Sequence, residues 1–313
     1  MKLQYYFSAI TAFLIWGIFS LVLKPLSSYP SIDILLYRIG FACVVAVLIS
    51  FVFRRKITRE NLRSFRALPK KDKWYMASNI FVSGIALAAN WFFFIYVMNN
   101  VSVNATSLAY LICPILTTVL ASIFLREKLN KIQWIAVGIS VFSCILLSYG
   151  HFLDVAYSFV IAISYAIYLV LQKRTQHFDK FFILTVHIVL CSILLLPLVY
   201  LMPPGVVFGQ DFYVYVLLIA VLFTIVPLFL NTYALKGLDS SLVGVLLYLN
   251  PIISFLLAVF YFHEGVNTIQ GIAYFLIFTA VVLFNVAYMT KKNTDLSSVN
   301  FSSLKESNDM RNL

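Results

Sequence analysis

The chain alternates long apolar runs with short polar connections, and the apolar runs have the length of membrane-spanning helices. A spanning helix needs about 20 predominantly apolar residues. The first run is longer than the apolar core of a signal peptide, lacks a small-residue cleavage site and precedes nine similar runs, so we interpret it as a helix. The pattern predicts ten helices, over residues 3–23, 31–53, 74–98, 103–125, 132–149, 155–172, 181–202, 212–235, 241–262 and 268–289.

Composition supports the same class of protein. Of the 313 residues, 62% are hydrophobic and 11% are charged, whereas soluble domains carry about 25% charged residues. Ten helices use about 200 residues and leave enough chain for the connections. We therefore expect an all-α integral membrane protein with ten transmembrane helices.

The basic residues are unevenly distributed along the chain. The 23 Lys and Arg residues give a formal net charge of +11, and with the N-terminus in the cytosol all of them except Lys24 and Arg38 fall on cytosolic segments. This excess is typical of cytosolic connections, so it predicts both termini in the cytosol and requires no nucleic acid. The densest cluster, from Arg54 to Lys73, attracts anionic lipid or forms a regulatory or partner site.

The second half of the chain repeats the first. At an offset of 137 residues, 12 ungapped identities fall between position 96 and position 146. Each half, 1–150 and 151–290, contains five predicted helices, and an odd number means that the two halves enter the membrane in opposite directions. Such inverted repeats are typical of secondary transporters. The matched pairs include Tyr96 with Tyr233, Pro114 with Pro251, Glu127 with Glu264, Asn130 with Asn267, and Gln133 with Gln270.

The cations change between the two copies as the inversion predicts. LREKLNK at 125–131 becomes FHEGVNT at 262–268, which keeps the Glu and loses the cations where the segment faces outward. The remaining residues, 291–313, are polar, and we expect a disordered cytosolic tail.

Several stretches resemble the EamA-like families of the drug/metabolite transporter superfamily, most closely the RarD-like branch. The stretches are FLIWGIFSLVLK (13–24), DILLYR (33–38), NWFFFIYVMNN (90–100), SLAYLICPILTTVLASIFLREKLNKIQWIAV (107–137), TIVPLFL (224–230) and NPIISFLLAVFYFHE (250–264). The resemblance implies a central cavity between two inverted repeats and export of a small metabolite or drug-like solute across a bacterial cytoplasmic membrane. The sequence departs from the pattern at Asp33, which stands for Glu, and at Cys113, which stands for Asn.

Polar side chains inside the spans are candidates for the wall of this cavity, because polar atoms in a membrane need partners in protein or water. Arg38 lies about 10 Å deep in its helix at 1.5 Å per residue; it lines the cavity, or it reaches the outer surface while Asp33 caps the helix. The amides and aromatic rings bind solute or serve interhelical packing. The candidates are Trp16, Asp33, Arg38, Asn90, Trp91, Tyr165, Asn231, Tyr248 and Asn250.

Three titratable residues are candidates for proton coupling, namely Asp33, His187 and Glu264. A structural, hydrogen-bonded role is the alternative for His187, and a hydrated position at the span end is the alternative for Glu264. Pro114 and Pro251 free backbone carbonyls, so each predicts a hinge or a simple kink.

The chain contains no phosphate-binding loop, no zinc-binding His motif and no Gly-rich dinucleotide turn. We therefore expect no cofactor, no metal site and no enzymatic activity. The sequence favours a secondary transporter whose partners are a small-molecule substrate and the lipid bilayer. A channel and a membrane-embedded enzyme are the alternatives.

Overall fold

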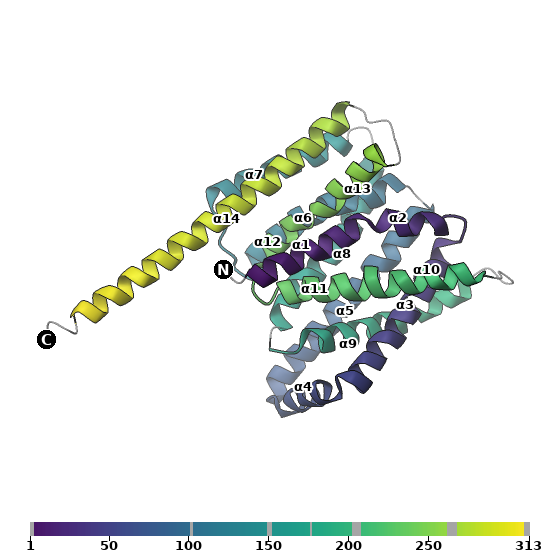
Figure 1. The fold of residues 1–313 in the computed structure, drawn as a ribbon, viewed down its shortest axis with the longest axis horizontal. Coiled ribbons are helices and arrows are strands. Elements are labelled where there is room, and N and C mark those ends of the chain that lie inside the picture. Colours follow the sequence, from purple (N-terminus) through teal and green to yellow (C-terminus); the bar gives the residue numbers. More distant parts are fainter. Residues whose placement is uncertain are drawn as a thin grey trace.

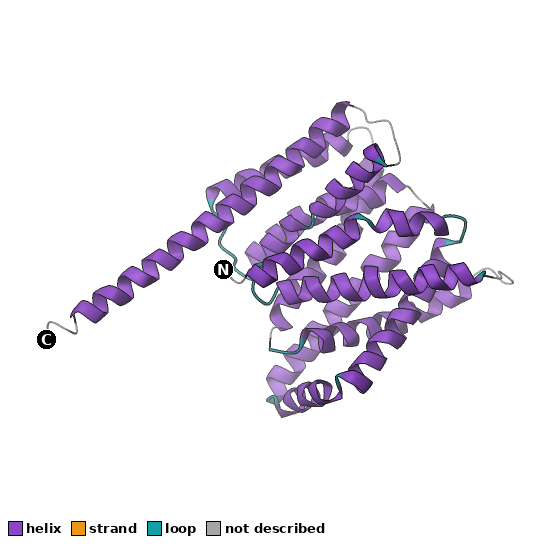
Figure 2. Ribbon diagram, in the orientation of Figure 1, coloured by secondary structure: helices purple, strands orange, loops and turns teal. Residues whose placement is uncertain are grey.

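The structure is a computed structural model that describes residues 3–100, 103–148, 152–175, 177–201, 208–261 and 268–309. Within these ranges the regular structure is entirely helical (Figure 2). The α-helices are α1 (Leu3–Gly17), α2 (Phe19–Leu23), α3 (Ser31–Leu48), α4 (Arg55–Ala67), α5 (Lys70–Asn100), α6 (Val103–Phe124), α7 (Lys131–Ser148), α8 (Phe152–Gln172), α9 (Lys180–Leu195), α10 (Gln210–Ala220), α11 (Val226–Ala234), α12 (Ser240–Leu246), α13 (Leu249–Phe260) and α14 (Thr268–Asp309).

Nine helical stretches of the described chain are long and apolar enough to cross a membrane. They begin at Leu3, Ser31, Lys70, Lys131, Val155, Lys180, Gln210, Ser240 and Thr268. The predicted span 103–125 corresponds to α6, whose described apolar part, Leu108–Phe124, is shorter than the other nine. The predicted all-α, multi-pass class is confirmed, and the count of ten stays a prediction.

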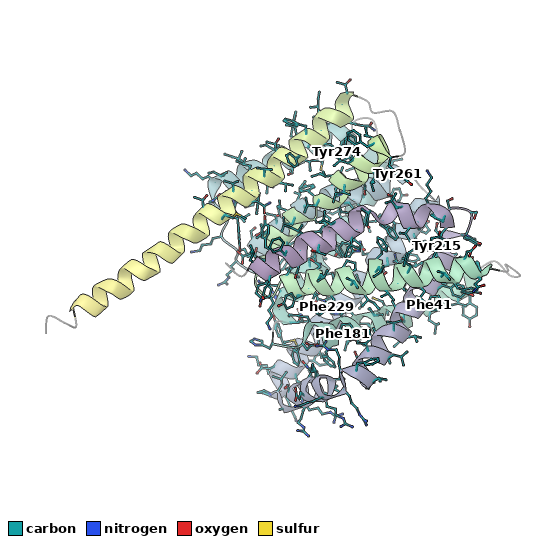
Figure 3. The ribbon with its side chains drawn as sticks, in the orientation of Figure 1. Phe41, Phe181, Tyr215, Phe229, Tyr261 and Tyr274 are labelled. Carbon is teal, nitrogen blue, oxygen red and sulfur yellow. The ribbon has the colours of Figure 1, made fainter. Side chains whose placement is uncertain are left out.

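Most of the extensive contacts between helices join a helix of the first half of the chain to a helix of the second half. Helix α8 packs against α5 and α6, α1 packs against α11 and α13, and α3 packs against α9 and α10. Helices α7 and α14 lie side by side at one edge of the bundle (Figure 1). Between α9 and α11, the rings of Phe181 and Phe229 meet edge to face, with centroids 5.9 Å apart (Figure 3). The core is therefore shared by both halves.

Helix α4 is a surface helix that the hydropathy pattern treats as a connection. Its side chains are mostly polar and exposed, while Thr58 is buried. Arg54, just before it, forms a two-pronged ion pair with Asp179, with nitrogen–oxygen distances of 2.9 and 3.1 Å. Immediately after it, Trp74 at the start of α5 is 78% exposed. A basic helix followed by an exposed indole is typical of a membrane interface.

Helix α14 continues to Asp309 and projects from the bundle (Figure 1). Polar composition predicts disorder for residues 291–313, and this stays a prediction, while the bounds of α14 include residues 291–309. The extension contains neither Gly nor Pro, and lengthening an established helix avoids the cost of nucleating a new one.

Candidate functional site

A cavity of about 380 Å³ lies between the two halves of the chain. Its wall comes from α1, α2, α3, α5, α6, α8, α11, α13, α14 and the π-helical turn Val221–Ile225 that joins α10 to α11. The volume falls at the lower end of the range of small-molecule sites, about 300–1,000 Å³. The predicted candidates that line it are Trp16, Arg38, Asn90, Trp91, Tyr165 and Asn250.

Arg38 is the one charged side chain among the described residues that line the cavity. Its guanidinium carbon lies 5.3 Å from the centroid of the Trp91 ring, which is cation–π distance. The Nε atom is buried and has no hydrogen-bond partner. The one ion pair between described residues is that of Arg54 with Asp179, so Asp33 does not neutralise Arg38. The guanidinium therefore faces the cavity without a counter-ion among the described residues.

The indole of Trp16 is fixed by a carbonyl that a proline leaves free. Pro227 has no N–H to offer the carbonyl of Phe223, four residues earlier in the helix. Trp16 Nε1 donates to that oxygen at 2.9 Å. The ring of Trp16 also meets Tyr165 edge to face, with centroids 6.2 Å apart. Trp16 thus presents its ring, and not its N–H, to the cavity.

The amides of the wall are partly committed to the protein. Asn90 Nδ2 donates to the Ile161 carbonyl at 2.9 Å. Asn231 is fully buried behind the wall, where its Nδ2 donates to the Tyr165 hydroxyl at 3.4 Å. Asn231 therefore supports a cavity residue and does not itself line the cavity.

Two other described candidates, Asp33 and Tyr248, do not line this cavity. Asp33 is buried in the first turn of α3, and neither of its carboxylate oxygens has a hydrogen bond. Tyr248 lines a separate void of about 10 Å³ beside α6, α7 and α14. Glu264 lies outside the described residues.

His187 lies at the junction of α5, α8 and α9 and is fully buried. Its Nδ1 is 3.0 Å from Gln172 Nε2, which can only donate, so Nε2 carries the proton. That N–H faces Ser83 Oγ at 2.8 Å and the Ile80 carbonyl at 3.1 Å. The imidazole is therefore a neutral interhelical hydrogen-bonding group and does not line the cavity.

The two hinge candidates differ in their surroundings. Pro251 lines the cavity three residues after the interruption at Leu247–Tyr248 that separates α12 from α13. Pro114 lies inside the uninterrupted helix α6. A break in the helix thus accompanies Pro251 and not Pro114.

Sequence reasoning missed several residues of the wall, including Tyr110, Ser254 and Tyr274, the last labelled in Figure 3. Helical spacing could have found two of them. Tyr110 precedes Pro114 by four residues and Ser254 follows Asn250 by four, so each shares a helix face with a residue already singled out.

One end of the bundle is held shut by contacts between the halves, and we call it the closed end. There Glu127 accepts hydrogen bonds from Ser240 N and Ser241 N at 2.7 and 2.9 Å and from Ser241 Oγ at 2.6 Å. Within the second half, at the same end, Lys173 Nζ donates to the Leu235 carbonyl at 2.8 Å and to that of Leu238. These groups cap the start of α12 and the end of α11.

Close backbone approaches complete the closed end. The rings of Tyr5 and Tyr233 have centroids 5.0 Å apart. A Cβ added to Gly237 would lie 1.9 Å from Tyr5, and one added to Gly244 would lie 2.8 Å from Thr117. Only glycine fits at these two contacts.

Comparison with known proteins gives relatives over nearly the whole chain. An uncharacterized transporter, YojE, of Bacillus subtilis is 28% identical over 295 residues, covering 91% of this chain and 95% of the relative. The RarD protein of Escherichia coli is 26% identical over 303 residues, covering 91% and 95%. One crystal structure, at 18% identity, superposes with a TM-score of 0.70 over 90% of this chain and 96% of the other, which shows a common fold.

The sequence model of the EamA-like transporter family matches residues 3–149 and 154–286. These two matches cover both halves of the chain and all the described spans except the last residues of α14. The resemblance to RarD inferred from sequence motifs is thereby confirmed. The chain belongs to the EamA-like transporter family.

Proposed function

We propose that this protein is a secondary transporter that moves a small metabolite or drug-like solute across the bacterial cytoplasmic membrane by alternating access. The observation that carries the proposal is the cavity itself, which lies between the two halves and is blocked at the closed end. A solute held there is reached from one side at a time. The two halves rock around it as inverted repeats of five helices each.

The pattern of helix contacts supports the inverted repeat. If the halves are equivalent, each contact recurs with the halves exchanged. The contact of α5 with α8 matches that of α11 with α1, and the contact of α6 with α8 matches that of α13 with α1. The contacts of α3 with α9 and of α7 with α14 each join two equivalent helices, so exchanging the halves leaves them unchanged. The two separate matches to the family, one in each half, support the same arrangement.

The distribution of charge supports an orientation with the closed end in the cytosol. Lys128, Lys173 and the basic helix α4 belong to segments at this end, where the positive-inside rule places cations. Most cavity residues fall in the opposite halves of their helices, such as Asn90 in the second half of α5 and Tyr274 in the first half of α14. The structure then represents an outward-facing conformation of a protein whose two termini are cytosolic.

Two cysteine variants test this geometry in a background with the four native cysteines replaced. Leu23, the first position, lies on the cavity wall. Thr117, the second position, is buried on α6 where that helix packs against Gly244 of α12. In right-side-out vesicles, a membrane-impermeant maleimide is expected to label Leu23→Cys and to spare Thr117→Cys. Equal labelling of the two positions contradicts the outward-facing assignment.

Transport is tested by comparing metabolites of deletion and overexpression cells and then measuring counterflow of the enriched solutes in proteoliposomes. Saturable exchange between inside and outside solute, with accumulation outside the deletion-complemented cell, supports an exporter. Unitary currents in planar bilayers without counterflow indicate a channel. Chemical conversion of the solute indicates an enzyme. The names of the relatives, an uncharacterized transporter and RarD, do not describe one.

A further inference from the structure

We propose that the solute is a compact monoanionic carboxylate with a planar apolar body, and that Arg38 binds its carboxylate in the central cavity. This inference rests on the proposed function, because it assigns a chemical class to the solute of the same cavity. Three observations carry it: the guanidinium that no described carboxylate neutralises, the absence of any other charge among the described wall residues, and the aromatic surfaces around them.

The guanidinium is placed to receive an anion from the cavity. It carries the one charge among the described wall residues, and no described carboxylate pairs with it. An uncompensated charge in apolar surroundings is unfavourable. Stacking on Trp91 at 5.3 Å holds the guanidinium plane against the wall. Its terminal nitrogens are then free for the paired hydrogen bonds that suit a carboxylate.

The other donors of the wall are uncharged; several are occupied by the protein, while the Ser20 hydroxyl has no described partner. The N–H of Trp16 is taken by the Phe223 carbonyl, and Nδ2 of Asn90 is taken by the Ile161 carbonyl. The Ser254 hydroxyl donates to the Gly17 carbonyl at 3.1 Å. The acceptor atoms of a solute therefore find their strongest partner at Arg38.

A single cation favours a single negative charge. A phosphate monoester carries a charge of about −1.5 to −2 at neutral pH, which the single cation of the described wall does not balance. A carboxylate balances the site one to one. The rings of Trp16 and Tyr165, 6.2 Å apart and nearly perpendicular, form an aromatic corner that suits a planar apolar group.

Four probes of similar size separate these features. They are 3-phenylpropanoate, its neutral amide, the corresponding primary amine, and phenyl phosphate. Binding of each is measured by calorimetry on the purified full chain in detergent. The carboxylate is expected to bind about tenfold more tightly than the amide, as a hydrogen-bonded charge pair provides, and more tightly than the amine or the phosphate.

Arg38→Gln removes the charge and keeps a polar side chain. It is expected to bring the carboxylate and the amide to within about twofold of each other, since the charge pair is lost while apolar contacts stay. Arg38→Lys keeps the charge and is expected to retain a reduced preference. Arg63→Gln, a matched loss of an exposed cation on α4, is expected to leave the preference unchanged.

Equal binding of carboxylate and amide to the unmodified protein overturns the proposal, as does a preference that survives Arg38→Gln. Tighter binding of phenyl phosphate, or no binding of 3-phenylpropanoate at millimolar concentration, also overturns it. None of these outcomes affects the proposed transport function, which depends on counterflow of enriched solutes and on cysteine labelling. If Arg38→Gln does not fold, the four probes on the unmodified protein and on Arg38→Lys decide the question.

Discussion

Replacement of Glu127 tests whether the closed end controls access to the cavity. This carboxylate belongs to the connection between α6 and α7 in the first half and caps α12 in the second, so it joins the halves at one point. Glu127→Gln keeps the shape of the side chain. It removes the charge and converts one acceptor oxygen into a donor that faces N–H groups.

The magnitude follows from the three hydrogen bonds. A hydrogen bond to a charged group contributes about 1.5–3 kcal/mol, and the side chain is partly exposed, which weakens each bond. Loss of the charge and of one acceptor is expected to cost the closed end about 1–2 kcal/mol, in the range of an N-terminal cap. Such a change shifts a two-state ratio by a factor of about 5–30.

The assay is labelling of Thr117→Cys from the cytosolic side in inside-out vesicles. Addition of Glu127→Gln is expected to speed labelling by about 5–30-fold, because the closed end opens more often. Glu60→Gln, which alters an exposed carboxylate on α4, serves as the control. Unchanged labelling together with an unchanged unfolding temperature would refute the assignment of Glu127 to the closed end.

Three further replacements test other contacts. Gly244→Ala is expected to lower stability by about 1–3 kcal/mol because its Cβ meets a neighbouring helix, whereas Gly271→Ala, with open space around it, is expected to be neutral or stabilising in thermal unfolding. His187→Phe is expected to destabilise by about 1–3 kcal/mol through unpaired buried partners while transport keeps its dependence on the pH gradient; loss of that dependence makes the residue a proton relay. Arg54→Gln breaks the ion pair with Asp179 and is expected to lower the free energy of unfolding by about 1 kcal/mol. Arg59→Gln, exposed on α4, is expected to leave the unfolding temperature unchanged; equal effects of the two replacements would show that the ion pair does not stabilise the protein.

The class of fold was predictable because length and hydropathy decide which segments cross a membrane. Arg38 and Asn90 could be singled out for the same reason, since a polar group in an apolar run needs a partner. Family motifs added Trp16, whereas its ring contact with Tyr165 is a tertiary contact that the sequence does not predict. The hydropathy pattern did not predict α4, because a polar amphipathic helix at an interface is not an apolar run.

Residues whose role depends on tertiary contacts were beyond sequence reasoning. From sequence, a carboxylate at the end of a span is expected to be hydrated. Only the packing of α12 against the α6–α7 connection shows that Glu127 caps α12. Likewise Asn231 and Tyr248 are residue types that are common in cavity walls, yet both are buried in the packed core. His187 satisfies both ring nitrogens with groups from two other helices, which one sequence does not bring together.

The placement of Trp74 gives the molecule a built-in optical contrast. The chain has four tryptophans. Trp16 and Trp91 line the cavity, whereas Trp74 and Trp134 are 78% and 46% exposed. Lipids brominated along their tails are expected to quench the fluorescence of the outer pair, and aqueous iodide entering the cavity that of the inner pair. A variant with Phe at 74 and 134 would then report, through its own emission, when the cavity fills and empties.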